Sequence, residues 1–443
     1  MRNPRKFLKL VTILGASAAL MATSACQSGS LTGSNNVSAG VITIKLLHTN
    51  DTTNTAIAKA ISDGFNASQS KYKVTLESRP GGTEGDNLVK TRLATGSMDD
   101  LFQYNAGSLM NNLNPTKNLI PLDDQSYVKD YSDPFKVSVT SSTDGKIYGA
   151  PWGAGNAGGI MYNIKVYKEL GLSVPKTWAE FMANCAKIKA AGKTAVIQSY
   201  GTTWTSQLFV LADFGNVNVA DPTWAPSYTA NKAKYVDPPA IEGFQHVEDT
   251  YKAGYFNSDA ASLTLDNALK MLATGAGVQY PILSGNIQTV TQNNPDLVND
   301  LGFFPIPGND ASKVVMTDWV TNGIYIPTTT TGAKLEGVKA FLNWIESSDG
   351  CKAQSASFSP NGPFGMKNCS PSGNLPQVAK DVISYSDQGK ASVALEFVSP
   401  LKGPNLESIL ILVGTGQKTA KEAAALYDGD VKKQALQLGL PGW

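Results

Sequence analysis

Acidic side chains on predicted loops are the first candidates for chemistry in this sequence of 443 residues. Asp51, Glu84 and Asp318 each stand on a loop that borders a predicted strand. A glycosidase needs two carboxylates that flank the scissile bond, one of them with a raised pKa, but no motif ties any two of these acids together. The sequence also lacks the nucleophile elbow G-x-S-x-G and the P-loop G-x-x-x-x-G-K-[ST]. An enzyme that acts on glycans therefore stays an alternative without a catalytic signature, and helix capping or solvated charge is the other interpretation of these acids.

Aromatic and amide side chains on the loops indicate a different chemistry, the recognition of a sugar. Sugar rings pack on aromatic side chains, and sugar hydroxyls need hydrogen-bond donors and acceptors held in place. Trp204 follows a predicted strand in a Thr-rich loop and Trp319 precedes another, so each either contacts a ligand or packs in the core. Asn50 and Asn105 end predicted strands and supply amides. Few charges accompany these residues, which favours a neutral, hydroxylated ligand.

Strands that alternate with helices must position these side chains. The pattern predicts strands, separated by amphipathic helices, over residues 41–47, 72–77 and 100–104. Such alternation is typical of a parallel sheet covered on both faces, and ligands bind at the carboxyl ends of its strands. We therefore expect the loops at 50–51, 81–84 and 105–108 to lie along one edge of the sheet.

A second α/β region follows Tyr148. Thr177 is a predicted N-cap of a helix that runs through Cys185 to Lys189, and a further helix is predicted over 336–346. Strands are predicted over residues 160–163, 195–197, 302–308 and 323–327. The chain thus contains two α/β regions in succession.

The first residues read as an export signal. Arg2, Arg5, Lys6 and Lys9 precede an apolar run of about a dozen residues, which is too short to span a bilayer. Ser24 and Ala25 stand before Cys26 and resemble the lipoprotein box of bacteria, in which the cysteine carries lipid, although Thr23 replaces the usual leucine. The alternative is an ordinary secretory signal with a chance cysteine. Residues 27–40 are rich in Ser, Gly and Asn and predict a flexible linker.

The length, net charge and histidine content of the sequence limit the number of lobes and the classes of partner. About 400 residues remain after the leader, which is natural for two lobes. The net charge is +1 and no basic cluster follows the leader, so a nucleic acid is not an expected partner. Only His48 and His246 are present, which argues against a histidine-based metal site, and no cofactor is expected.

Three cysteines follow the leader. Cys185 lies in a helical pattern and is expected to be a small buried residue. Cys351 and Cys369 are close in sequence, and export permits a disulfide. The residues alone leave open whether these two cysteines pair.

Several stretches in order resemble one known family. They are IYGAPW at 147–152, MYN at 161–163, LGLSVPKTWAEF at 170–181, FPIPG at 304–308 and AFLNWI at 340–345. With the leader, they are similar to the extracellular solute-binding proteins of carbohydrate ABC importers, the group that contains maltose-binding protein. No single stretch is decisive, and the resemblance covers essentially the whole chain after the leader.

The resemblance implies the type II periplasmic-binding-protein-like α/β fold, with two lobes joined by a hinge and a ligand cleft between them. The first crossing between the lobes is expected between Pro151 and Gly159, the second near Leu301 and the third near Asp349. The expected divisions are a lipoprotein signal peptide at 1–25, a lipidated cysteine and linker at 26–40, lobe 1 at 41–150 and 303–349, and lobe 2 at 151–302 and 350–443.

The resemblance also implies partners and site residues. A sugar is the expected ligand, the permease subunits of an ABC importer are the protein partners, and the protein is an exported monomer anchored by lipid to the outer face of the cytoplasmic membrane. The same receptor could instead carry a polyol, a peptide or another small solute. Trp204, Tyr280 and Asn156 match regions where the family supplies contacts, and Trp152 either lines the cleft or packs under the hinge. The full expected set is Asn50, Asp51, Glu84, Asn105, Trp152, Asn156, Trp204, Tyr280, Asp318 and Trp319.

Residues 153–158, GAGNAG, fit the dinucleotide fingerprint G-x-G-x-x-G. That fingerprint must open a helix, whereas a strand-like run begins at Gly159. We therefore interpret these glycines as a hinge, where they permit the backbone torsions that lobe closure changes.

Overall fold

The computed structural model describes residues 40–357, 362–370 and 374–443. The predicted signal peptide (1–25), Cys26, which is predicted to carry lipid, and nearly all of the predicted linker lie outside these residues. Residues 41–443 form one compact unit that contains two β-sheets. Within the part of the chain described, no helix has the length and apolar character needed to cross a membrane.

The first sheet has five strands in the order β2-β1-β3-β10-β4. Strand β1 pairs in parallel with β2 and β3, and β10 pairs antiparallel with β3 and β4. The strands are β1 Ile42–Thr49, β2 Tyr72–Arg79, β3 Leu101–Tyr104, β4 Gly149–Trp152 and β10 Asn322–Tyr325. The helices of this region are α1 Thr52–Ser68, α2 Gly82–Thr95, α3 Ser108–Asn111, α4 Pro115–Asn118, η1 Ser126–Asp130, α5 Asp133–Ser138, α14 Gly332–Ile345 and α15 Ser348–Ser357.

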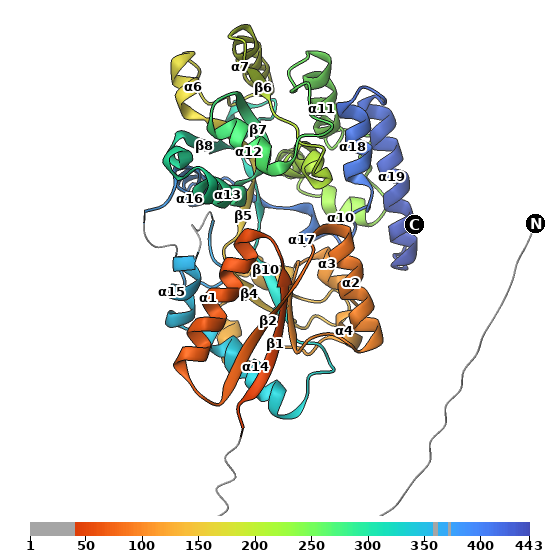
Figure 1. Cartoon of the computed structure of the whole chain (residues 1–443). Helices are drawn as coiled ribbons and strands as arrows, with labels where there is room; N and C mark the ends of the chain where they lie inside the picture. Colours follow the sequence, from red (N-terminus) through yellow and green to blue (C-terminus); the bar gives the residue numbers. More distant parts are fainter. Residues whose placement is uncertain (1–39, 358–361, 371–373) are drawn as a thin grey trace, which may run out of the picture. The chain divides into compact units, whose positions relative to one another are not determined.

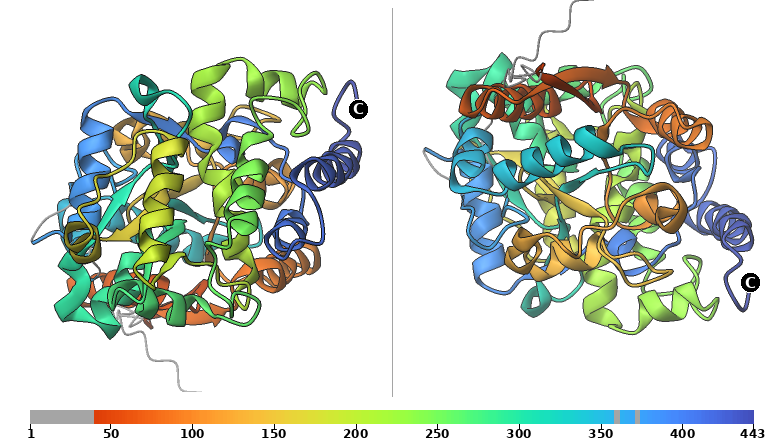
Figure 2. Two further views of the ribbon diagram at one scale, coloured as in Figure 1. Left: turned by 90° about the horizontal axis from the view of Figure 1, so that it is seen from above. Right: turned by 90° about the horizontal axis from the view of Figure 1, so that it is seen from below.

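Apolar periodicity accounts for the packing of this first lobe. Ile57, Ala58, Ile61 and Phe65 form the buried face of α1, as the helical spacing predicts. Val338, Phe341 and Leu342 of α14 join the same core cluster as the β1 side chains Ile44 and Leu46. Helices α1 and α14 contact each other, and the view from below in Figure 2 shows them as the red and cyan helices.

The second sheet has six strands, in the order β11-β9-β5-β7-β6 with β8 also paired to β5. Its strands are β5 Asn156–Asn163, β6 Thr194–Val196, β7 Gly277–Leu283, β8 Leu301–Phe304, β9 Met316–Trp319 and β11 Ala391–Val393. The helices of this region are α6 Ile164–Glu169, α7 Trp178–Ala190, η2 Thr203–Gln207, α8 Leu208–Ala212, α9 Phe214–Ala220, α10 Trp224–Thr229, α11 Glu242–Lys252, α12 Leu265–Ala273, η3 Ser284–Asn286, α13 Ile287–Asn293, η4 Pro295–Asp300, η5 Ala311–Lys313, α16 Gln377–Asp387, α17 Leu395–Val398, α18 Leu406–Gly414 and α19 Ala420–Gln437.

Two local predictions in the second lobe are confirmed. The Thr177 hydroxyl accepts a hydrogen bond from the Glu180 backbone N–H at 3.2 Å and so caps α7. Cys185 on that helix is buried and free.

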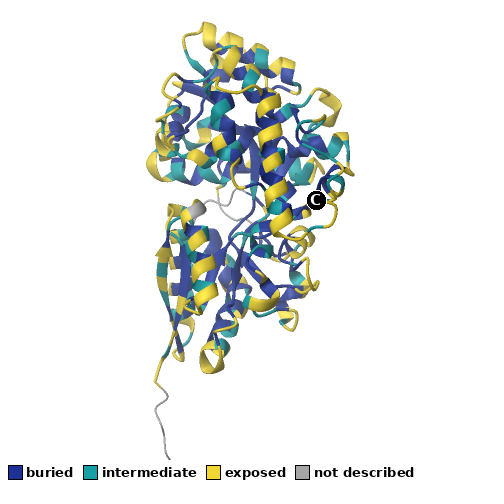
Figure 3. Ribbon diagram, turned by 90° about the vertical axis from the view of Figure 1, so that its right-hand side faces the viewer, coloured by how far each residue is buried: buried dark blue, intermediate teal, exposed yellow. Residues whose placement is uncertain are grey.

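In Figure 1 the second lobe occupies the upper half and the first lobe the lower half. Figure 3 shows buried strands inside each lobe and exposed residues on the outer helices.

The first crossing between the lobes lies inside the expected interval of 151–159, whereas the later crossings differ from their expected positions. Strand β4 extends to Trp152, so the first crossing is residues 153–155 and the boundary at 150 falls inside a strand. Strand β8 pairs with β5, so the chain stays in the second lobe at 303 and returns at 320–321, between β9 and β10. An apolar run such as Leu301–Phe304 suits either sheet, because periodicity does not name the partner strand.

The third boundary, expected at 349–350, also differs. Helix α15 contacts α1 of the first lobe, and Cys351 on α15 forms a disulfide with Cys369. Helix α16 contacts β8 of the second lobe. Helix α15 and Cys369 therefore belong with the first lobe, and the chain has reached the second lobe by α16.

Candidate ligand-binding site

The carboxyl ends of the first-lobe strands bring five of the expected residues toward the crossings. Asn50 and Asp51 follow β1, Asn105 follows β3 and Trp152 ends β4. Glu84 lies in the first turn of α2, which follows β2. Since β1, β2 and β3 are parallel and β4 runs in the same direction, these residues share one edge of the sheet.

Asp51, Asn54 and Trp152 form a hydrogen-bonded chain at this edge. Asp51 Oδ1 accepts from the Asn54 backbone N–H at 2.9 Å and caps α1, and Asp51 Oδ2 accepts from Asn54 Nδ2 at 2.6 Å. Asn54 Oδ1 in turn accepts from Trp152 Nε1 at 2.6 Å. Trp152 is only 2% exposed, so it packs beneath the crossing and orients the Asp51 carboxylate through Asn54. Sequence reasoning missed Asn54, whose one signal was its position three residues after an N-cap.

The other first-lobe residues of the expected set differ in how far their side chains are exposed. Asn50 and Glu84 are exposed and Asn105 is partly exposed. The Asn50 backbone N–H donates to Arg79 O at 2.8 Å, and Asn105 O accepts from Tyr325 Oη at 3.1 Å. Backbone bonds thus hold these loops while the exposed side chains face solvent.

Arg79 is a buried cation at the same edge that the sequence did not reveal. It is 3% exposed, and its guanidinium donates to Pro80 O at 3.1 Å and Gln103 O at 3.3 Å. It also lies 5.4 Å from the centre of the Tyr104 ring. Burial lowers the pKa of Arg79, and the nearby Asp86 carboxylate opposes that shift. Nothing in the sequence around Arg79 distinguishes it from an arginine on the surface, so its burial could not be predicted.

Trp319 and Asn156 are neighbours on two adjacent strands of the second sheet. Strand β9 pairs antiparallel with β5 so that Trp319 is opposite Asn156 and Asp318 is opposite Ala157. Trp319 Nε1 donates to Glu396 Oε1 at 3.0 Å, and Lys402 Nζ pairs with Glu396 Oε2 at 3.2 Å. Trp319 is partly exposed and packs against the cores of both lobes. The role of Glu396 could not be predicted from the sequence, because only the fold brings α17 close to Trp319.

A small cavity lies beside the Trp319 ring. Its lining is mainly apolar and aromatic, with the Glu396–Lys402 ion pair as its polar part. The lining residues are Leu211, Phe214, Tyr235, Trp319, Ala394, Leu395, Glu396, Leu401, Lys402 and Tyr427. Trp319 is the one member of the expected set in this lining.

Trp204 and Tyr280 take different positions in the second lobe. Trp204 is partly exposed at the second position of η2 and packs against the core cluster that contains Ala157 and Met316. Tyr280 is 0% exposed, and its hydroxyl is 2.5 Å from Ser199 Oγ, which is 2.8 Å from Thr205 Oγ1. Tyr280 therefore packs in the core and supports the loop that carries Trp204.

The two lobes contact each other through helices that adjoin these loops. Helix α1, which follows Asp51, contacts α13 of the second lobe, and α17 contacts α3 and α5 of the first. Gly107 lies so close to α17 that an added Cβ would meet the Glu396 carbonyl and come within 2.9 Å of the Phe397 ring. The described contacts therefore bring the region of Trp319 and Glu396 close to the loop that follows Asn105, whereas they place Trp204 within the second lobe.

Comparison with known proteins supplies the family. A model of the bacterial extracellular solute-binding proteins matches residues 49–350. This chain belongs to that family. A relative, the multiple sugar-binding protein of Streptococcus mutans, is 25% identical over 312 residues, which are 68% of this chain and 70% of the relative.

Solved structures share the two-lobe fold of this solute-binding protein. A chitin oligosaccharide binding protein superposes with a TM-score of 0.77 at 21% identity, covering 89% of this chain and 99% of that one. RafE in complex with raffinose superposes with a TM-score of 0.74 at 20% identity, covering 88% of this chain and 100% of that one. The predicted type II α/β fold is thus confirmed, and an extracellular family supports export.

Asp318 is an acidic residue that precedes Trp319 on β9. Its Oδ1 is buried and has no hydrogen-bond partner among the described residues, although the residue as a whole is partly exposed. Burial raises the pKa of Asp318 from 3.8 to about 7. The folded protein therefore holds a proton here that the unfolded chain releases near its ordinary pKa.

Asp318→Asn is expected to raise the melting temperature more at pH 8 than at pH 5. Because the folded state binds the extra proton between the two pKa values, the stability of the wild type falls as the pH rises through that window. Asparagine removes this loss, which is at most roughly 4 kcal/mol and is reduced by solvent around the exposed part of Asp318. Thermal unfolding at both pH values measures the effect, with exposed Asp349→Asn as the control. An equal change at pH 5 and pH 8 would contradict it.

Proposed function

We propose that this solute-binding protein is the membrane-anchored receptor of an ABC importer that captures a mono- or oligosaccharide between its lobes. The observation that carries the proposal is the contact between the lobes beside candidate residues: α1, which follows Asp51, contacts α13, and α17, bonded to Trp319 through Glu396, contacts α3, which follows Asn105. Aromatic rings stack on sugar faces, while amides and carboxylates bind hydroxyls. Closure is favoured because ligand contacts from both lobes exist together only in the closed arrangement.

Names of similar proteins support a sugar as the ligand. The relative from Streptococcus mutans is a multiple sugar-binding protein, and the structural neighbours bind chitin oligosaccharide and raffinose. We propose that Cys26 carries the lipid anchor and that the filled monomer delivers the sugar to permease subunits. A polyol, a peptide or another small solute is the alternative cargo, and an exported glycan-active enzyme is the alternative class.

A thermal-shift screen of the purified protein tests the function. The ligands are raffinose, di-N-acetylchitobiose, other mono- and oligosaccharides, polyols and peptides. A ligand that binds only the folded state stabilises it by ~2.7 kcal/mol at a hundredfold excess over its dissociation constant. We expect a shift with a sugar and no product after long incubation. A shift only with a polyol or peptide would change the cargo, and consumption of the sugar would identify an enzyme.

Trp204→Ala is expected to weaken binding of the sugar at least tenfold and also to lower the melting temperature, because the ring packs against a core cluster of the second lobe. Its partly exposed ring offers a stacking face at the second-lobe edge, and loss of a central aromatic contact costs roughly 2 kcal/mol or more in a binding site. Titration calorimetry with the sugar from the screen measures the loss. The matched control is Trp443→Ala, because Trp443 bonds through Nε1 to Thr229 O at the far C-terminus. Equal affinities for both variants would remove Trp204 from the site.

A further inference from the structure

The first crossing is held through its backbone N–H groups. Gly153 N–H donates to Gln354 Oε1 at 2.8 Å, and Gly155 N–H donates to Pro363 O at 2.7 Å. Ala154 between them forms an isolated antiparallel bridge with Phe364. Both ends of the crossing thus bond to the stretch of chain that the Cys351–Cys369 disulfide closes.

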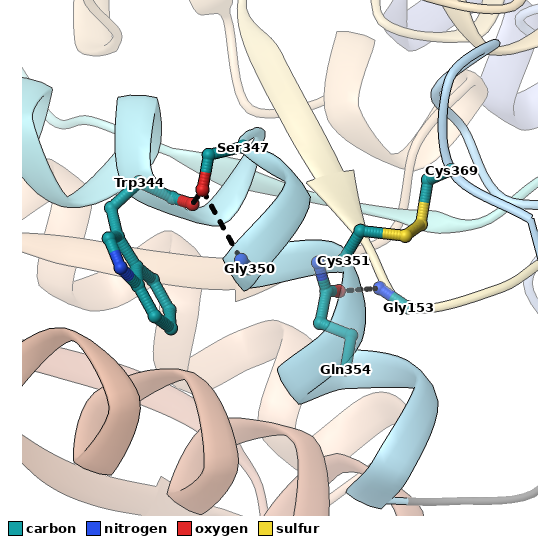
Figure 4. Close-up of a disulfide and its surroundings, with 7 residues drawn as sticks. All are labelled: Gly153, Trp344, Ser347, Gly350, Cys351, Gln354 and Cys369. Atoms are coloured by element: carbon teal, nitrogen blue, oxygen red, sulfur yellow. Dashed lines mark hydrogen bonds between the residues drawn. A yellow bond between two sulfur atoms is a disulfide. The ribbon is translucent and has the colours of Figure 1, made fainter.

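That stretch is anchored in the first lobe. Gln354 lies three residues after Cys351 on α15, and α15 contacts α1. Lys367 N–H donates to Asp130 O at 2.8 Å, and Met366 bridges to Tyr131. The predicted possibility of a Cys351–Cys369 disulfide is therefore confirmed, and Figure 4 shows it beside the bond from Gly153 to Gln354.

Close packing leaves the crossing little room to shift against this stretch. An added Cβ at Gly362 would lie 2.5 Å from Gly155 O, and one at Gly365 would lie 2.8 Å from the Pro151 ring. Gly153 itself has φ of 70°, a left-handed torsion that favours glycine. The Thr321 hydroxyl of the second crossing also donates to Trp152 O. When one lobe rotates against the other, backbone torsions in residues 153–155 must change, and these residues are held on both sides by the hydrogen bonds and close contacts described above.

We propose that Gln354, held by the Cys351–Cys369 disulfide, is a positioning residue that stabilises the arrangement in which the lobes touch. Its amide oxygen bonds to the pivot residue Gly153 in a structure where α1 contacts α13 and α17 contacts α3. Loss of the bond frees the crossing, makes closure less favourable and so weakens ligand binding by population shift. The inference rests on the proposed function, since its consequence is a change in sugar affinity, but Gln354 does not touch the sugar.

Gln354→Met keeps the length of the side chain and removes the acceptor, and Cys351→Ser with Cys369→Ser removes the tether. Lys352→Met is the control, because the Lys352 side chain lies on the same helix and is 78% exposed. Hydrogen exchange followed by mass spectrometry is measured without ligand on peptides that cover residues 149–156. Peptides from β1 and β7 report any general loosening of the two lobes.

We expect exchange at the crossing to rise at least fivefold in Gln354→Met and in the double cysteine variant, with exchange in β1 and β7 unchanged. The melting temperature is expected to fall in both variants, because Gln354→Met leaves the buried Gly153 N–H without its acceptor. The dissociation constant for raffinose or di-N-acetylchitobiose, whichever binds the wild type, is expected to rise three- to tenfold, mostly through faster dissociation. Unchanged exchange at the crossing, or faster exchange with unchanged affinity, overturns the proposal. Failure of the wild type to bind any sugar overturns the proposed function instead, and the exchange result still decides whether Gln354 positions the crossing.

Discussion

Glu346→Gln is expected to unfold at a higher temperature than the wild type at pH 8. Glu346 ends α14, is 8% exposed and has Oε1 buried without a hydrogen-bond partner among the described residues. Burial raises the pKa of this carboxyl well above its usual range, and the carbonyl end of a helix further disfavours a negative charge. Glutamine has nearly the same size and shape as glutamate and removes the ionisable group from that position.

The sign of the pH dependence follows from the raised pKa. The folded state holds a proton on Glu346 at pH values where the unfolded chain has released it, so stability falls as the pH rises above the ordinary pKa of 4.5. The gain in melting temperature should therefore be small at pH 4.5 and grow toward pH 8 in differential scanning calorimetry. Exposed Glu336→Gln on the same helix is the control and should change little. A lower melting temperature for Glu346→Gln at pH 8 would show that the carboxylate is stabilised in the folded protein.

Gly158→Ala is expected to reduce sugar affinity at least tenfold. Gly158 lies on β5 beneath the Trp319 ring, and an added Cβ would overlap the ring edge and lie 3.0 Å from Ala212 Cβ. The ring cannot swing away freely, since its Nε1 is bonded to Glu396 at 3.0 Å. The methyl group must therefore move Trp319 or the strand, and such overpacking typically costs ~1–3 kcal/mol of stability.

Calorimetric titration and thermal unfolding separate the two consequences of Gly158→Ala. The control is Gly429→Ala, because an added Cβ at Gly429 meets no atom within 4 Å on the exposed face of α19. That control should stabilise the protein by ~0.5–1 kcal/mol through helix propensity and leave affinity unchanged. Wild-type affinity in Gly158→Ala would mean that the position of Trp319 does not matter for binding.

Much of the local structure was predictable because it depends on short-range pattern. The buried face of α1, the Thr177 cap and the strand character of the residues after Gly159 all agree with the sequence, although β5 already begins at Asn156. That strand, in place of a helix, removes the dinucleotide interpretation. Gly153 and Gly155 lie in the crossing as the hinge interpretation expected, whereas Gly158 is part of β5 and makes room for Trp319.

The parts that were not predictable depend on pairing between distant segments. Strand β8 pairs with β5 of the second sheet. Its sequence is a short apolar run that could pair with a strand of either sheet, so the pairing could not be predicted. Asn54, Arg79 and Glu396 act at the candidate site through partners that only the fold brings near. Tyr280 lies inside the second lobe because the register of β7 on β5 places it opposite Met161.

The measurement that tests the central claim most directly is the crystal structure of the protein with the sugar that gives the largest thermal shift. We predict one sugar molecule between the lobes, with its ring on Trp204 or Trp319 and its hydroxyls bonded to at least one of Asn50, Asp51 and Asn105. Sugar bound to one lobe alone, or at a surface away from both strand edges, would contradict the account.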